Sequence, residues 1–100
     1  RVLENIVFLE LQRRKKEVYY FSEKKECDFV LRVGAKIKEA IQVCYELTKE
    51  NKDREVSGLL EVLEKFDLRD GLILTSDQEE TFLQDKRKIR VLPVWKWLLS

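Results

Sequence analysis

Histidine and methionine are both absent from this 100-residue sequence. Without histidine the chain has no Ser-His-Asp or Cys-His catalytic group, and it has no zinc site that depends on imidazole. The sequence opens at Arg1 rather than at a methionine. We therefore expect residues 1–100 to form a single domain excised from a longer protein.

Cysteine, glycine and proline are scarce: two, three and one residues respectively. Two cysteines are too few for a disulfide framework and form no CxxC pair, so a reducing, cytoplasmic setting is expected. No apolar run approaches the roughly 20 residues of a membrane span. The three glycines are isolated and form no phosphate-binding loop, so ATP is not expected to bind this chain.

Neither sign of charge dominates, because 20 basic residues face 19 acidic ones. No overall basic field therefore favours nucleic acid. Basic runs at residues 13–16 and 86–90 are interpreted as a solvated helix end and a hairpin tip. Contact with nucleic-acid phosphates is the alternative interpretation of both runs.

The pattern of apolar residues predicts an α/β fold with a mixed sheet flanked by helices. A helix is expected first, followed by a three-strand meander, a second helix, a strand, a hairpin and a short C-terminal helix. The short strand is expected to return to the same sheet by a crossover and to be buried on both faces. The expected ranges are 2–14, 17–22, 26–33, 36–45, 54–66, 72–75, 81–83, 89–92 and 93–99.

An acidic residue, Asp28, lies in the middle of the second expected strand. A bend near Ala35 would place Asp28 opposite Gln42, with Cys44 on the same face. Cys27 would then project from the other face, so no disulfide is expected. A buried carboxylate needs a partner, a metal ion or access to water. Both a solvated strand end and a metal-binding position therefore remain open for Asp28.

Several stretches together resemble a known family. The predicted order of elements resembles the core of the PD-(D/E)xK nuclease superfamily, which includes restriction enzymes. The sequence is most similar to the C-terminal nuclease-like domain of prokaryotic, especially archaeal, AAA-type ATPases. The similar stretches cover nearly the whole chain: residues 3–11, 17–20, 26–30, 41–45, 71–75 and 91–98.

The resemblance implies a degenerate site. It places the helix acid of the superfamily on Glu4, with Glu10 as a less favoured substitute, and the strand acid on Asp28. The (D/E)xK motif falls on residues 42–44, where Gln42 replaces the carboxylate and Cys44 replaces the lysine. Mg²⁺ favours carboxylate oxygens, and a thiol cannot supply the positive charge of an ammonium group. Loss of phosphodiesterase activity is therefore expected.

Three functions follow from these observations. The preferred one is a non-catalytic accessory domain that binds an upstream ATPase domain of the same chain, another protein or nucleic acid. ATP would bind that upstream domain. The second is a divergent Mg²⁺-dependent nuclease that uses a lysine such as Lys36 or Lys38. The third is a structural dimerisation or partner-docking domain.

Two tryptophans close the sequence, at Trp95 and Trp97. A spacing of two prevents one helix face from burying both rings. We expect one ring to complete the core, because tryptophan usually buries most of its surface. The other ring is a candidate for partner contact.

Overall fold

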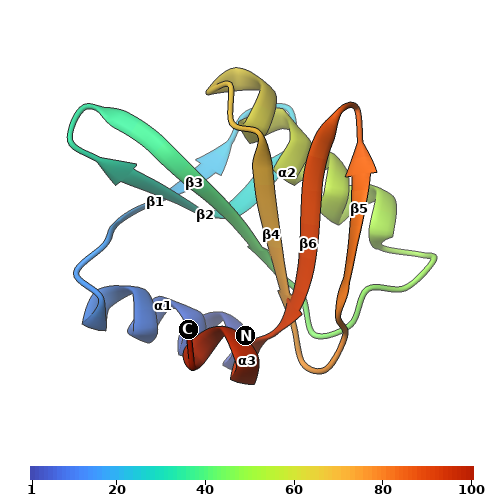
Figure 1. Ribbon diagram of the computed structural model, residues 1–100, viewed down its shortest axis with the longest axis horizontal. Helices are drawn as coiled ribbons and strands as arrows, with labels where there is room; N and C mark the ends of the chain where they lie inside the picture. The colour runs from blue at the N-terminus through green and yellow to red at the C-terminus, as the bar shows by residue number, and fades with distance from the viewer.

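The computed structural model describes all residues 1–100, in three helices and six strands (Figure 1). The expected order of elements is confirmed throughout. The elements are α1 Val2–Arg13, β1 Glu17–Ser22, β2 Glu26–Val33, β3 Lys36–Val43, α2 Lys52–Lys65, β4 Asp70–Thr75, β5 Glu80–Gln84, β6 Arg87–Pro93 and α3 Val94–Leu98.

The six strands form one mixed sheet in the order β1-β2-β3-β4-β6-β5. The β3–β4 and β4–β6 pairs are parallel, and the other neighbours are antiparallel. The predicted crossover is the connection from β3 through α2 to β4. The α/β class and the mixed sheet that the sequence predicted are thus present.

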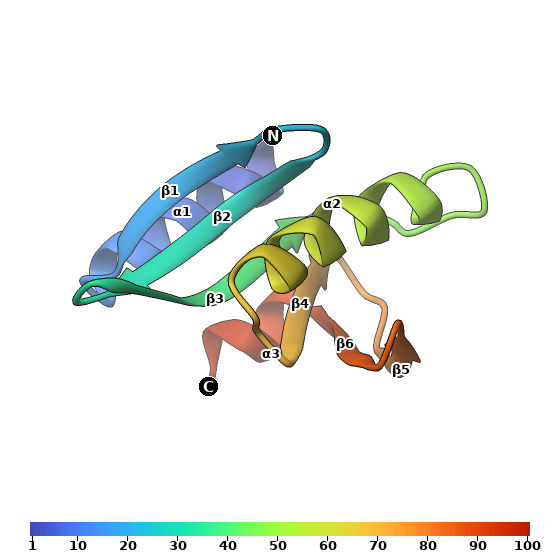
Figure 2. The same ribbon diagram turned by 90° about the horizontal axis from the view of Figure 1, so that it is seen from above.

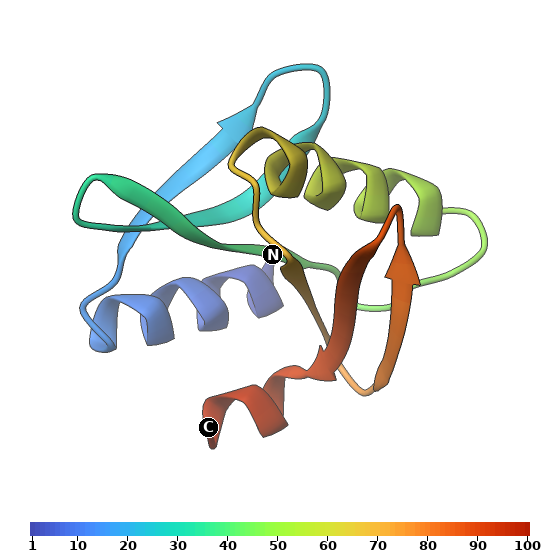
Figure 3. The same cartoon turned by 45° about the horizontal axis from the view of Figure 1, so that its top comes forward.

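Helices cover both faces of the sheet (Figures 2 and 3). Helix α2 packs on one face, where Leu59 and Leu63 belong to a core with Ile73 and Ile89. Helices α1 and α3 share the other face, where the core includes side chains of β2, β3 and β4. Strand β4 contributes to both cores and is buried between them, as its apolar run predicted.

Most predicted boundaries shift by one or two residues: β4 and β6, for example, begin at Asp70 and Arg87, two residues before the predicted starts. The third strand ends at Val43 instead of residue 45, although the next backbone N–H, that of Cys44, still donates to Leu74 of β4. Helix α2 begins at Lys52, two residues before the predicted start, with Asn51 as its N-cap residue.

Strand β2 contains one extra residue relative to β1. Tyr19 pairs with Val30 and Phe21 pairs with Cys27, so three steps along β2 match two along β1. This β-bulge contains Asp28, and it brings Cys27 to the same face as Val30. The expectation that Cys27 and Cys44 lie on opposite faces was therefore wrong. Both pack against the α2 core, and both are free thiols.

Gly58 allows α2 to lie against the start of β2. A Cβ atom at this position would lie 2.0 Å from the carbonyl oxygen of Glu26. The helix backbone can therefore approach β2 only because residue 58 lacks a side chain.

None of the three helices is long and apolar enough to cross a membrane.

Candidate functional site

Asp28 and Gln42 meet where β3 passes from its partner β2 to its partner β4. The β2–β3 pairing of Phe29 with Ile41 and of Val30 with Ala40 continues the register that the sequence predicted. The backbone N–H of Asp28 donates to Oε1 of Gln42 at 2.9 Å. In return, Oδ2 of Asp28 accepts a 2.8 Å hydrogen bond from the backbone N–H of Val43.

The side chain of Gln42 makes three hydrogen bonds, all of them to backbone groups. Its Nε2 donates to the carbonyl oxygens of Glu26 at 2.9 Å and Glu55 at 3.0 Å. With the bond from Asp28, this amide joins β2, β3 and α2. Only 3% of the Gln42 surface is exposed, so no water replaces these partners when they are lost.

The four positions expected for the degenerate site share one pocket. Glu4 from α1, Asp28 from β2, and Gln42 and Cys44 at the end of β3 all line a cavity of about 580 Å³. The structure thus brings together side chains that are up to 40 residues apart in sequence.

The surroundings of Asp28 raise the pKa of its carboxyl group. Burial raises the pKa of its carboxyl to about 6, and the carboxylates of Glu4 and Glu55 add to this effect. The hydrogen bond from Val43 opposes the rise. Both the burial and the neighbouring negative charges disfavour the ionised form.

The sequence analysis missed five charged residues of this pocket, one of which is Glu26 at the start of β2. Arg54 and Glu55 enter it from α2, and Lys24 and Lys25 enter it from the β1–β2 turn. Burial raises the pKa of Glu55, although the hydrogen bond from Arg54 opposes this shift. In the sequence, only the position of residues 54 and 55 in the first turn of a crossover helix pointed to this pocket. No sequence pattern indicated that the β-bulge or the β1–β2 turn would lie beside it.

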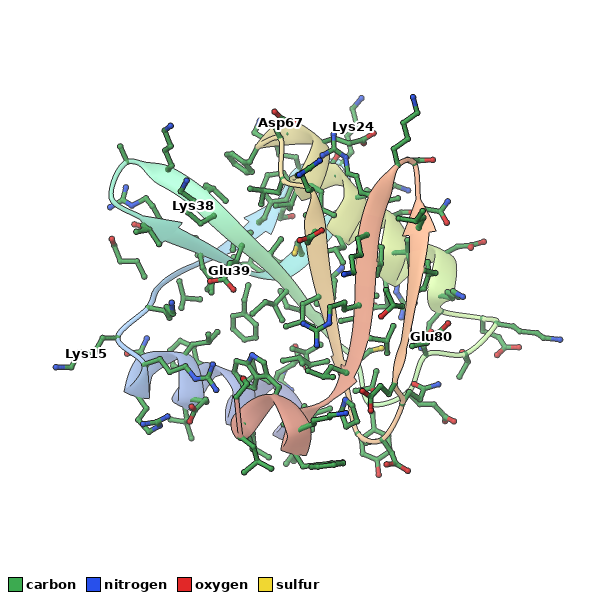
Figure 4. The ribbon with its side chains drawn as sticks, in the orientation of Figure 1. Lys15, Lys24, Lys38, Glu39, Asp67 and Glu80 are labelled. Atoms are coloured by element: carbon green, nitrogen blue, oxygen red, sulfur yellow. The ribbon has the colours of Figure 1, made fainter.

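Two weaker candidates lie elsewhere. Glu10 binds Arg13 and Arg14 on α1, each at 2.7 Å, and these bonds lower its pKa to about 2. Lys38 lies on β3 and lines a different pocket beside Asp70 and Arg90 (Figure 4). Lys24, labelled in the same figure, and its neighbour Lys25 are the lysines that line the cavity containing Asp28.

Cys44 has no cationic neighbour that outweighs its acidic ones. Burial, together with the negative charges of Glu55 and Asp28, raises the pKa of its thiol to about 12. Burial likewise raises the pKa of Cys27 to about 12. Both side chains are therefore protonated, unreactive thiols at neutral pH.

The two tryptophans differ as predicted. Trp97 is buried in the core under α1 and α3, and the guanidinium of Arg14 lies 4.6 Å from its ring centre. Trp95 remains 56% exposed.

In this structure, no three acidic or cysteine side chains of the pocket come close enough together to hold one metal ion. Moreover, Oε1 of Gln42 already accepts a hydrogen bond from Asp28, and the amide nitrogen faces two carbonyl oxygens. The residue at the first motif position is thus a structural amide.

Comparison with known proteins gives one informative relative. The chain is 37% identical, over 111 aligned residues, to MJ1544 of Methanocaldococcus jannaschii, a protein described as uncharacterized. The alignment includes the whole chain but only 25% of that protein, so the chain spans about a quarter of its relative. No family model matches the chain, and no solved structure matches it.

Proposed function

We propose that this chain is a nuclease-like domain that has lost catalysis and serves as an accessory, binding domain of a AAA-type ATPase. The observed sequence of a helix, a three-strand meander, a crossover helix and a parallel strand supports a restriction-endonuclease-like order. The shared pocket of Glu4 and Asp28 supports descent from a metal-dependent site.

The observation that carries the loss of catalysis is the bonding of Gln42. A metal ligand needs a free oxygen lone pair directed at the ion. In Gln42, one lone pair of the oxygen accepts from Asp28 and both nitrogen donors hold backbone carbonyls of β2 and α2, so only the second lone pair of a neutral amide oxygen is left for an ion. Its role in this pocket is to support the fold.

The replacement of the motif lysine by Cys44 removes a second catalytic group. Lysine supplies a positive charge that stabilises a developing phosphorane, and each such electrostatic group is worth about 10²–10³ in rate. The protonated thiol of Cys44 carries no charge. The two replacements together remove the catalytic motif.

The accessory role in a longer protein is supported by the length of the relative. Three quarters of that protein lie outside the region that this chain matches. In the proposed longer protein, ATP would bind an upstream domain, because this chain has no glycine-rich phosphate loop.

One observation favours a second function, a divergent Mg²⁺-dependent nuclease. Lys24, Lys25 and Arg54 bring positive charge into the cavity that contains Asp28. One of them would then replace the missing lysine of the motif.

A cleavage assay separates the two functions. The chain is incubated with supercoiled plasmid and with single-stranded DNA, in MgCl₂ and separately in MnCl₂. The accessory function predicts no nicking above that of the matched variant Asp28→Asn. Metal-dependent cleavage that is present in the wild type and absent from Asp28→Asn and from Lys24→Ala would establish the nuclease instead.

A further inference from the structure

Basic side chains gather at the end of the sheet where its parallel strands begin. Strands β3, β4 and β6 run in the same direction, so they begin at one end of the sheet and finish at the other (Figure 1). Three segments that are distant in sequence bring exposed basic residues to the first end. We call these six residues the basic end: Lys36, Lys38, Arg69, Lys86, Lys88 and Arg90.

A fork in the sheet opens this end to solvent. Strands β3 and β4 pair over only three residues of each strand, and their earlier residues diverge (Figure 1). Lys38 of β3 and Arg90 of β6 line the cavity of about 280 Å³ at this fork. Lys88 is two residues from Arg90 and therefore extends from the same face of β6. Arg69 adjoins it, because the carbonyl oxygen of Arg69 accepts a 2.9 Å hydrogen bond from the N–H of Lys88.

The cations of the basic end are not neutralised by neighbouring acids. None of the six makes an ion pair within the chain. The nearby carboxylates of Glu39 and Asp67 are already paired with other basic residues. Only Asp70 and Asp85 lie unpaired among the six. The basic end therefore has an excess of four positive charges, in a chain whose net charge is +1.

The composition of the basic end favours duplex nucleic acid over a protein or a single strand. Protein interfaces are depleted of lysine and depend on aromatic anchors, but four of the six residues here are lysines. Single strands are bound by stacking their bases on aromatic rings. Strands β3, β4 and β6 contain no aromatic residue. Long cationic side chains without rings suit contacts to the phosphates of a duplex, whose bases remain stacked.

We infer that the basic end binds the phosphate backbone of duplex DNA without sequence preference. The segment from Lys86 to Arg90 extends about 13 Å. Phosphates follow one another every 3.4 Å or so along each DNA strand, so about three or four of them lie within reach. No residue of the basic end lines the cavity that contains Asp28. The inference thus goes beyond the proposed function, and its binding step needs neither a metal ion nor cleavage.

Fluorescence anisotropy of a labelled 20-bp duplex, titrated with the chain in EDTA, tests this binding. EDTA prevents metal-dependent cleavage, so the result does not depend on whether the Asp28 pocket is active. We expect a Kd on the order of 100 µM at 50 mM NaCl. A plot of log K against log[NaCl] is expected to have a slope of about −3, because each phosphate contact contributes about −0.9.

Two double variants locate the contact. Lys88→Gln with Arg90→Gln is expected to raise Kd about tenfold and to make the salt slope shallower by about 2. Lys15→Gln with Lys49→Gln is the matched control, because it removes two exposed, unpaired cations outside the basic end. The control is expected to keep Kd within twofold of the wild type.

Three results would overturn the inference. The first is no binding up to 1 mM chain, and the second is an equal loss in the two double variants. The third is competition by poly-glutamate as effective as that by unlabelled duplex at equal charge, which would indicate an acidic protein as the partner. Weaker competition is expected, because an extended polypeptide has one charge per 3.3 Å or so against about 1.7 Å for the duplex.

Discussion

Asp28 and Gln42 join β2 to β3 by two reciprocal hydrogen bonds between a side chain and the backbone of the other strand. The N–H of Asp28 donates to the side chain of Gln42 at 2.9 Å, and the carboxylate of Asp28 accepts from the residue that follows Gln42. These two bonds fasten β2 to β3 beside the bulge. Asp28 therefore contributes to the fold, and its carboxyl also has a pKa raised to about 6.

The stability of the fold is expected to depend on the protonation of Asp28. Its pKa is about 6 in the folded chain, above the ordinary aspartate value of 3.8. The folded state therefore binds more protons than the unfolded state between these values, and stability falls as pH rises from about 4 to 6. Asp28→Asn, which retains an acceptor for Val43, is expected to raise Tm by a few degrees at pH 7.5. The gain should vanish below pH 4, and a constant gain at all pH values would contradict this explanation.

Replacing the buried amide is expected to be costly. Gln42→Glu places carboxylate oxygens against the carbonyls of Glu26 and Glu55, which lose their donor. The free energy of unfolding should fall by about 3 kcal/mol, as measured by urea denaturation at pH 7. The exposed control Gln84→Glu should change it by less than about 0.5 kcal/mol. Similar losses in the two variants would show that the amide bonds of Gln42 contribute little.

The contact between α2 and β2 is expected to tolerate no side chain at residue 58. Gly58→Ala puts a methyl group 2.0 Å from a backbone oxygen, so the helix must move and the bonds of Gln42 must lengthen. We expect a loss of about 3 kcal/mol or more. Gly34→Ala is the control: its Cβ meets open space, and only its φ of +63° costs about 1 kcal/mol. Equal losses, measured by urea denaturation, would contradict the close approach.

The two tryptophans are expected to respond differently to truncation. Trp97→Ala removes a buried ring and its contact with Arg14, and should cost about 3–5 kcal/mol in unfolding free energy. Trp95→Ala should cost less than about 0.5 kcal/mol. Iodide quenching provides a second measurement, because the more accessible fluorescence of the wild type should disappear in Trp95→Phe. Quenching that persists in this variant would contradict the burial of Trp97.

Local patterns predicted much of this structure. The β-branched and aromatic run at residues 17–22 and the turn near Gly34 fixed the meander, and the apolar run of residues 72–75 indicated a strand buried on both faces. The register derived from that turn placed Asp28 beside Gln42. These features depend on neighbours in sequence or on simple burial, so the sequence alone was sufficient.

Long-range features were not predictable in the same way. The bulge at Asp28 arises from pairing with Tyr19 and Phe21, and it reversed the expected face of Cys27. Glu55 enters the pocket because α2 lies against β2 at Gly58, a contact between segments about 30 residues apart. Neither arrangement leaves a periodic pattern in the sequence.

The most direct test of the central claim, that this pocket no longer functions as a metal site, is an NMR titration of the Asp28 carboxyl carbon. In the absence of divalent ions, the midpoint is expected near pH 6. With 10 mM MgCl₂ the account predicts the same midpoint and unshifted amide signals of Asp28 and Val43. A saturable Mg²⁺-dependent shift of these amides, accompanied by a fall in the Asp28 pKa, would contradict it, because a bound cation favours the ionised carboxylate.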